Sequence, residues 1–208
     1  MLLNRKILYI LFLIFPLLIS CGEKKPDGTE NSQKTDYQNP LFLMQQAKKV
    51  LGDNVKFAYK GRFNIDSVIE IAAGTEIKNS KQWGIEFFLL ESNGSNLAVA
   101  YQTALLNGSF TKCLVQKIKF PMFDYELIYY NSQDYFLGSG GGEVYSYLID
   151  LKEHKTYFAH LVDEPGKPAS LFLSDNIDIR EIKSFFVSNF KRDYSELKVV
   201  PKDIVLKY

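Results

Sequence analysis

Cysteine, histidine and tryptophan are scarce in this chain of 208 residues, which contains two cysteines, two histidines and one tryptophan. Cys113, His154 and His160 are too few and too widely spaced for the ligand patterns of zinc sites. The charge is almost balanced, with 25 basic and 24 acidic residues and no cluster of lysine and arginine. A nearly neutral domain lacks the basic surface that nucleic acid requires. We therefore expect no metal or other cofactor and no nucleic-acid partner.

Motifs for phosphate binding and acyl transfer are also missing. A glycine-rich run, Gly138-Ser139-Gly140-Gly141-Gly142, is followed by Glu143 and a strand pattern. A phosphate-binding loop would continue with Gly-Lys-Ser/Thr into a helix. A nucleophile elbow would need G-x-S-x-G before a helix. We interpret the run as a loop between strands, with a loop that shapes a binding site as the alternative.

A catalytic triad would have to combine Ser139 and His160 with an acid such as Asp150 or Asp163. Nothing in their spacing brings these residues together. We therefore expect a non-catalytic binding module. A hydrolase with a site assembled from distant carboxylates, and a structural or assembly subunit, are the alternatives.

The longest apolar run lies at the start of the chain. Arg5 and Lys6 precede residues 7–19, which are apolar and include Pro16. The run is shorter than the roughly 18–20 residues of a membrane-spanning helix, and Pro16 disfavours helix continuation. A positive segment followed by a short apolar one is typical of a secretory signal. We expect residues 1–20 to be this signal.

Leu18-Ile19-Ser20-Cys21-Gly22 resembles the lipobox of bacterial lipoproteins, although Ile19 replaces the usual small residue. The resemblance implies that signal peptidase II cleaves between Ser20 and Cys21 and that the Cys21 sulfur carries diacylglycerol. Such acyl chains anchor a protein stably in a membrane. Gly22 stands where enteric inner-membrane lipoproteins have aspartate. The resemblance therefore implies a lipoprotein of the cell envelope, sorted to the outer membrane, with Cys113 as its lone thiol.

Residues 21–39 follow as the lipidated cysteine and a polar tether, because residues 23–39 contain too few apolar side chains to form a core. We expect one globular domain over residues 40–208. Asn39, Pro40 and Gly52 predict a helix over residues 40–51. Asp178 as N-cap and Glu181 at N3 predict a second helix over residues 179–190.

Alternating apolar positions predict the strands between and after these helices. Asn93-Gly94 predicts one hairpin turn and Lys152-Glu153-His154 another. The predicted strands cover residues 55–60, 66–73, 83–90, 96–103, 110–120, 125–130, 143–151, 155–163, 170–173 and 203–206. Because hairpins dominate, the sequence predicts an α+β, mainly β fold with an antiparallel sheet or meander.

Residues 61–67, Gly-Arg-Phe-Asn-Ile-Asp-Ser, followed by Val68-Ile69-Glu70-Ile71, are similar to the "GDFNGDG…DLVV" segment of FG-GAP/VCBS-type repeats. The similarity extends over residues 61–103. In that family the loop binds Ca²⁺, but Arg62 and Ser67 replace an acid and a glycine here. Asn64 and Asp66 alone are short of the six to eight oxygens that Ca²⁺ prefers.

Aromatic residues are dense over residues 120–136, with carboxylates and amides between them. Such a stretch suits either sheet packing or an exposed surface that binds a protein or glycan. The candidate binding surface combines this stretch with the glycine-rich run and comprises Tyr129, Tyr130, Tyr135, Ser139, Gly140 and Gly141.

Overall fold

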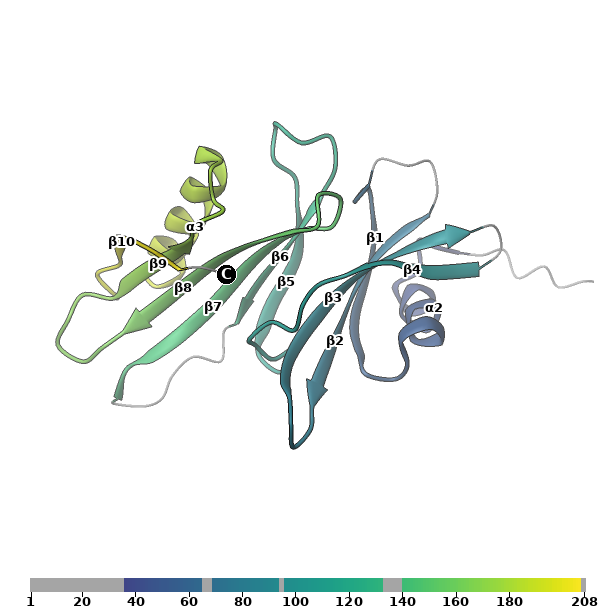
Figure 1. Cartoon of the computed structure of the whole chain (residues 1–208), viewed down its shortest axis with the longest axis horizontal. Helices are drawn as coiled ribbons and strands as arrows, with labels where there is room; N and C mark the ends of the chain where they lie inside the picture. Colours follow the sequence, from purple (N-terminus) through teal and green to yellow (C-terminus); the bar gives the residue numbers. More distant parts are fainter. Residues whose placement is uncertain (1–35, 65–68, 94–95, 133–139, 207–208) are drawn as a thin grey trace, which may run out of the picture. The chain divides into compact units, whose positions relative to one another are not determined.

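Strands make up most of the domain. The computed structural model describes residues 36–64, 69–93, 96–132 and 140–206, which belong to one compact unit, Asp36–Tyr208. These residues contain ten strands and two helices (Figure 1). Nearly all neighbouring strands run antiparallel. The predicted α+β, mainly β class is confirmed.

The first sheet has four strands in sequence order, each antiparallel to the next. They are β1 (Val55–Gly61), β2 (Glu70–Lys78), β3 (Trp83–Asn93) and β4 (Asn96–Gln102). Short connections make this meander possible, because antiparallel neighbours need only a hairpin between them. The strand expected over residues 66–73 is placed later, since β2 begins at Glu70; residues 65–68 lie outside the described residues.

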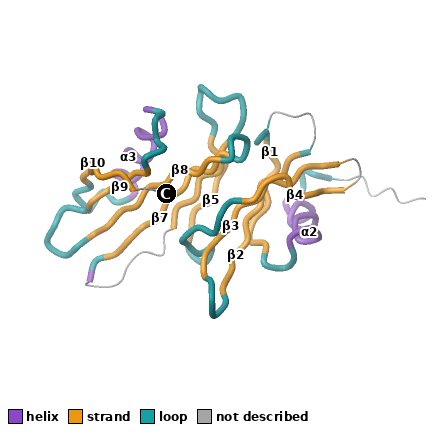
Figure 2. Tube along the Cα trace, in the orientation of Figure 1, coloured by secondary structure: helices purple, strands orange, loops and turns teal. Residues whose placement is uncertain are grey.

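The second sheet has six strands in the order β10-β9-β8-β7-β6-β5. They are β5 (Cys113–Ile118), β6 (Leu127–Ser132), β7 (Gly142–Asp150), β8 (Lys155–Asp163), β9 (Ser170–Ser174) and β10 (Val200–Leu206). All neighbours are antiparallel except β9 and β10, which are parallel. Helix α3 (Arg180–Asp193) connects this parallel pair, as a parallel crossover requires (Figure 2).

Helix α2 (Pro40–Leu51) has the predicted bounds and caps. The Asn39 side chain accepts a hydrogen bond from the Leu41 backbone N–H, and Gly52 has the positive φ of 84° expected after a helix. Leu43 and Ala47 are buried and pack with β1, β2 and β3. The helix therefore covers one face of the four-stranded sheet.

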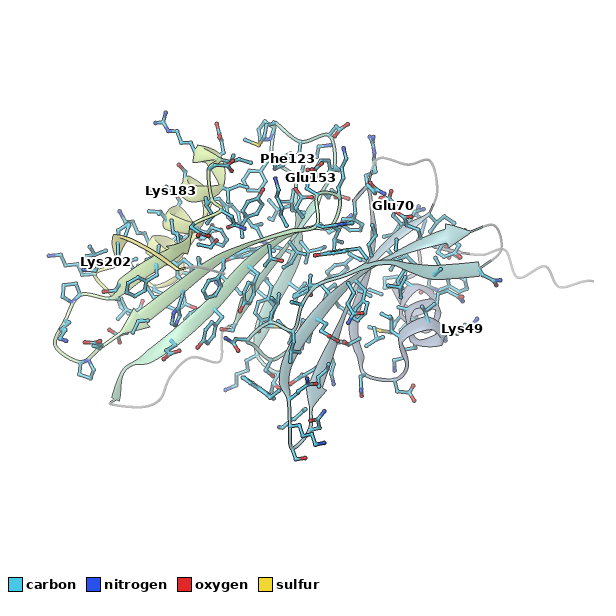
Figure 3. The ribbon with its side chains drawn as sticks, in the orientation of Figure 1. Lys49, Glu70, Phe123, Glu153, Lys183 and Lys202 are labelled. Carbon is cyan, nitrogen blue, oxygen red and sulfur yellow. The ribbon has the colours of Figure 1, made fainter. Side chains whose placement is uncertain are left out.

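The predicted N-cap of α3 is wrong. The helix begins at Arg180 with Ile179 as N-cap, and no side chain caps it. Ile179 packs against the core beneath the helix, so an apolar contact takes the position where the Asp178–Glu181 capping box was expected. Exposed residues such as Lys183 lie on the other side of α3 (Figure 3).

Large apolar side chains fill the space on both faces of the six-stranded sheet. On one face, Ile182, Phe186 and Phe190 of α3 pack on the sheet. On the other face, side chains of the four-stranded sheet pack against β6, β7 and β8. Phe87 and Tyr130 meet edge to face at 6.0 Å in this inter-sheet core. The two sheets therefore share one core layer.

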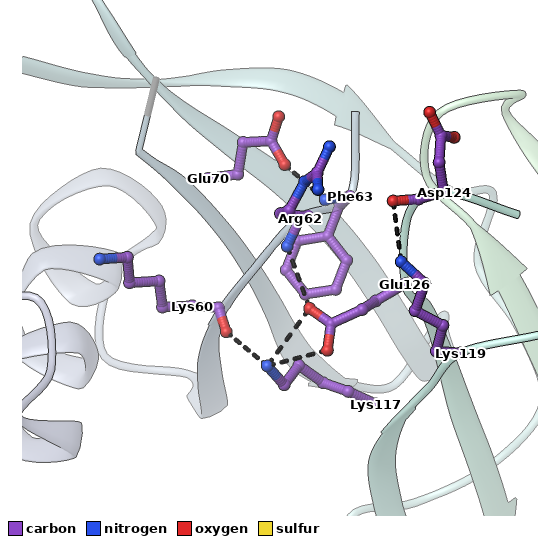
Figure 4. A network of polar contacts seen from close by, with 8 residues as sticks. All are labelled: Lys60, Arg62, Phe63, Glu70, Lys117, Lys119, Asp124 and Glu126. Atoms are coloured by element: carbon purple, nitrogen blue, oxygen red, sulfur yellow. Dashed lines mark hydrogen bonds and ion pairs between the residues drawn. The ribbon is translucent and has the colours of Figure 1, made fainter. Parts of the chain in front are cut away.

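A polar network also joins the sheets at the end of β1 (Figure 4). Glu126 accepts a hydrogen bond from the Arg62 backbone N–H at 3.0 Å, and Lys117 Nζ lies 3.1 Å from the Glu126 carboxylate. Lys117 Nζ also donates to the Lys60 carbonyl at 2.9 Å. Close by, the buried Glu70 carboxylate accepts the backbone N–H groups of Phe63 and Asn64.

Candidate functional site

One part of the six-stranded sheet lies beyond the inter-sheet core. Tyr147 and Phe158 are buried in that core. Two residues further along the same strands and on the same face, Tyr145 and His160 are only half-buried. Phe172, which pairs with His160 from the neighbouring strand β9, is also half-buried. We call Tyr145, His160 and Phe172 the aromatic row.

The strand register creates this row. Tyr145 pairs with His160, and His160 pairs with Phe172, so the three side chains point to the same face from β7, β8 and β9. The Tyr145 and His160 rings are stacked, with centroids 4.8 Å apart and planes 8° apart. Phe172 lies 6.4 Å from His160 at a tilt of 43°. The ring faces are thus turned toward one another along the row.

Glu143 completes the polar side of the row. Its Oε2 atom accepts a hydrogen bond from the Tyr145 hydroxyl at 2.5 Å and lies 3.2 Å from His160 Nε2. The Tyr145 hydroxyl and then His160 hold the pKa of Glu143 below its ordinary value. Burial and the Glu143 carboxylate raise the pKa of Tyr145 to about 12. Glu143 is therefore ionised, and Tyr145 protonated, at neutral pH.

A hollow of about 220 Å³ borders the aromatic row. Three of its lining residues are apolar, Val162, Pro168 and Phe172. Glu164 and Lys167 form an exposed ion pair at the same hollow. Val162 pairs directly with Glu143 across the strands, so the carboxylate and the hollow are neighbours on one sheet face. This volume suits one side chain or a small ring rather than a large cofactor.

The glycine-rich run leads directly into this site. Gly141 has φ of 87°, and a Cβ atom there would lie 2.2 Å from the Asp163 carbonyl oxygen. Only glycine combines that φ with so close an approach. Gly140 is exposed and has nothing near its Cβ position. Gly141 therefore lets the start of β7 lie against the end of β8, beside Glu143.

Two residues of the expected binding surface are in the core instead. Tyr129 is 1% exposed and Tyr130 is 0% exposed. Tyr129 packs edge to face on Phe185 beneath α3, and the Tyr130 hydroxyl donates to the Ser109 carbonyl at 2.8 Å. These tyrosines cannot contact a partner, because the sheet buries one on each face. Tyr135 and Ser139 lie outside the described residues.

Asp150 cannot complete a triad with His160. It lies on the opposite face of β7 from Glu143, is fully buried, and accepts the Tyr125 hydroxyl at 2.9 Å. The acid that reaches His160 is Glu143, which no motif in the sequence singles out. Among the described residues, no hydroxyl is hydrogen-bonded to the His160 ring.

His154 and Cys113 are not part of the site formed by Glu143 and the aromatic row. His154 is exposed in the β7–β8 turn, with φ of 55°, and stacks on Tyr101 at 4.1 Å. Cys113 is a half-buried free thiol. Its burial, and to a smaller extent the charge of Glu76, raises the pKa of the thiol to about 11. Such a thiol is a poor nucleophile near neutral pH.

The described residues of the FG-GAP-like loop do not form a group of metal-ligating side chains. Asn64 Nδ2 donates to Glu91 at 2.9 Å, and Asp66 and Ser67 lie outside the described residues. Within the described ranges, no three histidine, cysteine, aspartate or glutamate side chains are grouped as metal ligands.

The hairpin register could have revealed the site from the sequence. The Lys152-Glu153-His154 turn pairs Asp150 with Lys155, and equal steps outward from that pair lead to Tyr145 and His160. One further pair of steps along the face gives Glu143 and Val162. No comparable sequence signal predicts that Phe172 of β9 joins the site. The composition of the turn after β8 does not determine the register between β8 and β9.

Comparisons with protein-family models, curated proteins and solved structures found no match to this chain. Of the helices in the described part, neither is long and apolar enough to cross a membrane.

Proposed function

We propose that the chain is a lipid-anchored cell-envelope protein whose domain binds another envelope component, a protein or a glycan, without catalysis. The lipobox-like sequence at Cys21 supports the anchor and outer-membrane sorting, and the polar composition of residues 23–39 supports a tether. The observation that carries the binding role is the aromatic row beside Glu143 and the hollow.

Tyrosine and phenylalanine are enriched in the cores of protein interfaces, and tyrosine is among the residue types that contribute most binding energy. In the aromatic row they are half-buried, so a partner would remove more apolar surface from water at little cost in side-chain ordering. The stacking and the Tyr145–Glu143 hydrogen bond already hold these side chains in place. This preorganisation supports a binding role.

Photo-crosslinking in intact cells tests the binding role. A benzoylphenylalanine in place of Lys167, at the hollow, should give an adduct with an envelope component. Benzoylphenylalanine in place of Lys183, which is exposed on α3 on the opposite face of the sheet, is the matched control and should give no adduct. The Lys167 adduct should disappear when Tyr145 and Phe172 are replaced by alanine. An adduct that persists in that background would show that the aromatic row is not the binding surface.

The anchor has a separate test. Cys21→Ala should abolish metabolic labelling with palmitate and globomycin-sensitive processing, because no other residue offers the modified thiol at the cleavage point. Cys113→Ala is the control and should leave both unchanged. Labelling that survives Cys21→Ala would contradict the anchor without affecting the binding role.

A hydrolase is the second candidate, and the contact between Glu143 and His160 favours it. A carboxylate that holds one imidazole nitrogen leaves the other available to accept a proton from an attacking group. This function would be established if the wild type hydrolyses p-nitrophenyl acetate and the rate of hydrolysis falls at least 100-fold in His160→Ala. Equal rates for the two proteins would support binding alone.

A further inference from the structure

The Glu143 carboxylate at the aromatic row lacks a lysine or arginine partner among the described residues. Glu143 is ionised, and its hydrogen-bond partners are a tyrosine hydroxyl and an imidazole. Glu164, the other carboxylate at the hollow, is already paired with Lys167 at 2.5 Å. Glu143 has its side chain 47% exposed and has no lysine or arginine among its ion-pair partners in the described part of the chain. The site therefore presents a partly exposed carboxylate without a lysine or arginine partner beside an apolar hollow.

The ring arrangement favours a peptide over a sugar. A sugar ring stacks on the exposed face of an aromatic side chain. Here His160 lies between Tyr145 and Phe172, and the stacked pair covers one face of each ring. The row consequently offers ring edges and a hollow the size of a side chain rather than a flat platform.

We propose that this face takes a protein segment with an apolar side chain next to a lysine or arginine. The apolar side chain fills the hollow between Val162, Pro168 and Phe172, and the basic group pairs with Glu143. This inference rests on the proposed binding function and specifies the ligand class. Charge complementarity is what selects the occupant, since Glu164 is paired with Lys167 whereas Glu143, bound by Tyr145 and His160, has no lysine or arginine partner among the described residues.

Two dipeptide amides test the inference by NMR titration of the chain as cells make it, purified in a mild detergent. Ac-Phe-Lys-NH₂ should shift the backbone amide signals of Glu143, His160 and Ser170. Ac-Phe-Gln-NH₂, which lacks the charge, should bind about three- to fivefold more weakly at low salt, as expected for a partly exposed ion pair. The difference should vanish at about 0.5 M salt, where such pairs are screened.

Glu143→Gln should reduce the affinity for the lysine dipeptide to that of the glutamine dipeptide. Glu153→Gln, which removes an exposed carboxylate at the far end of the same hairpin, is the control and should not. Equal affinity of the wild type for both dipeptides, or no amide shifts with either, would overturn the inference. Shifts of the same amides by chitotetraose alone would also overturn it, while leaving the proposed binding face intact.

Discussion

At the scale of single residues, the informative side chains are charged groups that the fold places in unusual surroundings. Glu70 is 1% exposed and lies directly across from Glu91 in the β2–β3 register. Two backbone N–H groups bind its Oε2, whereas Oε1 has no partner within the described residues. The carboxylate therefore acts mainly as an acceptor for the turn that follows β1, which would otherwise bury unpaired donors.

Glu70→Ala should lower the free energy of unfolding by about 2–3 kcal/mol, because it leaves the Phe63 and Asn64 N–H groups without their acceptor. Urea unfolding followed by circular dichroism measures this. Glu86→Ala, which removes only an exposed contact to Gln102 on the same sheet, should cost less than about 0.5 kcal/mol. Equal effects of the two substitutions would show that the N–H groups find other acceptors.

Glu143 predicts an acid-dependent loss of stability. Its pKa is lower in the folded chain than the ordinary 4.5, chiefly because the Tyr145 hydroxyl binds the carboxylate. A carboxyl with a lowered folded pKa contributes stability above its unfolded pKa and loses it as the pH falls through the folded pKa. The wild type should therefore exceed Glu143→Gln in stability at pH 7, with the difference shrinking as the pH falls from 4.5 through the lowered folded pKa. A difference independent of pH would contradict this assignment.

At the scale of elements, local signals succeeded where the chain caps itself and failed where packing competes. Asn39, Pro40 and Gly52 define α2 as predicted, because each acts within one turn of the helix. At α3 the expected capping residue, Asp178, gives way to Ile179, which packs in the core. Element bounds depend on tertiary contacts whenever an apolar residue competes for the cap position.

Asn39→Ala should cost about 1 kcal/mol, since its side chain accepts the Leu41 N–H at 2.9 Å. Asn39→Asp, which keeps an acceptor and adds a negative charge at the helix N-terminus, should be neutral or slightly stabilising. Thermal unfolding of the two variants measures both. If they are equally destabilised, the cap is not the source of the effect.

At the scale of the whole domain, the two sheets depend on a shared layer. Phe87, 1% exposed, contacts Phe57 and Phe110 from its own side and Tyr130 from the other sheet. The Tyr59 hydroxyl adds a bond to the Val115 carbonyl at 3.1 Å. Neither sheet buries this face without the other, so we expect them to unfold together.

Phe87→Ala should lower stability by about 3–5 kcal/mol through loss of apolar contacts and a cavity. Hydrogen exchange should accelerate in β2 and β3 and equally in β6 and β7, because the cavity lies between the sheets. Val99→Ala, on a 45% exposed side chain of β4, is the control and should change little. Acceleration confined to the first sheet would show that the sheets unfold independently.

The sequence alone determined the secondary structure class, the caps of α2 and the β7–β8 hairpin, because these depend on neighbours a few residues apart. The lipobox at Cys21 is likewise a local pattern, and it stays a prediction. Burial was not determined: Tyr129 and Tyr130 are equally aromatic whether exposed or enclosed. Only tertiary packing buries them, Tyr129 under helix α3 and Tyr130 under the four-stranded sheet.

The candidate site was decided by tertiary structure. Glu143, His160 and Phe172 come from three strands, and only the register of β7, β8 and β9 makes them neighbours. Tyr145 packs at the margin of the inter-sheet core, and both Tyr145 and His160 are half-buried, whereas Tyr147 and Phe158 are enclosed in it. No local pattern encodes where a covering layer stops, since that boundary is set by contacts between residues far apart in the chain.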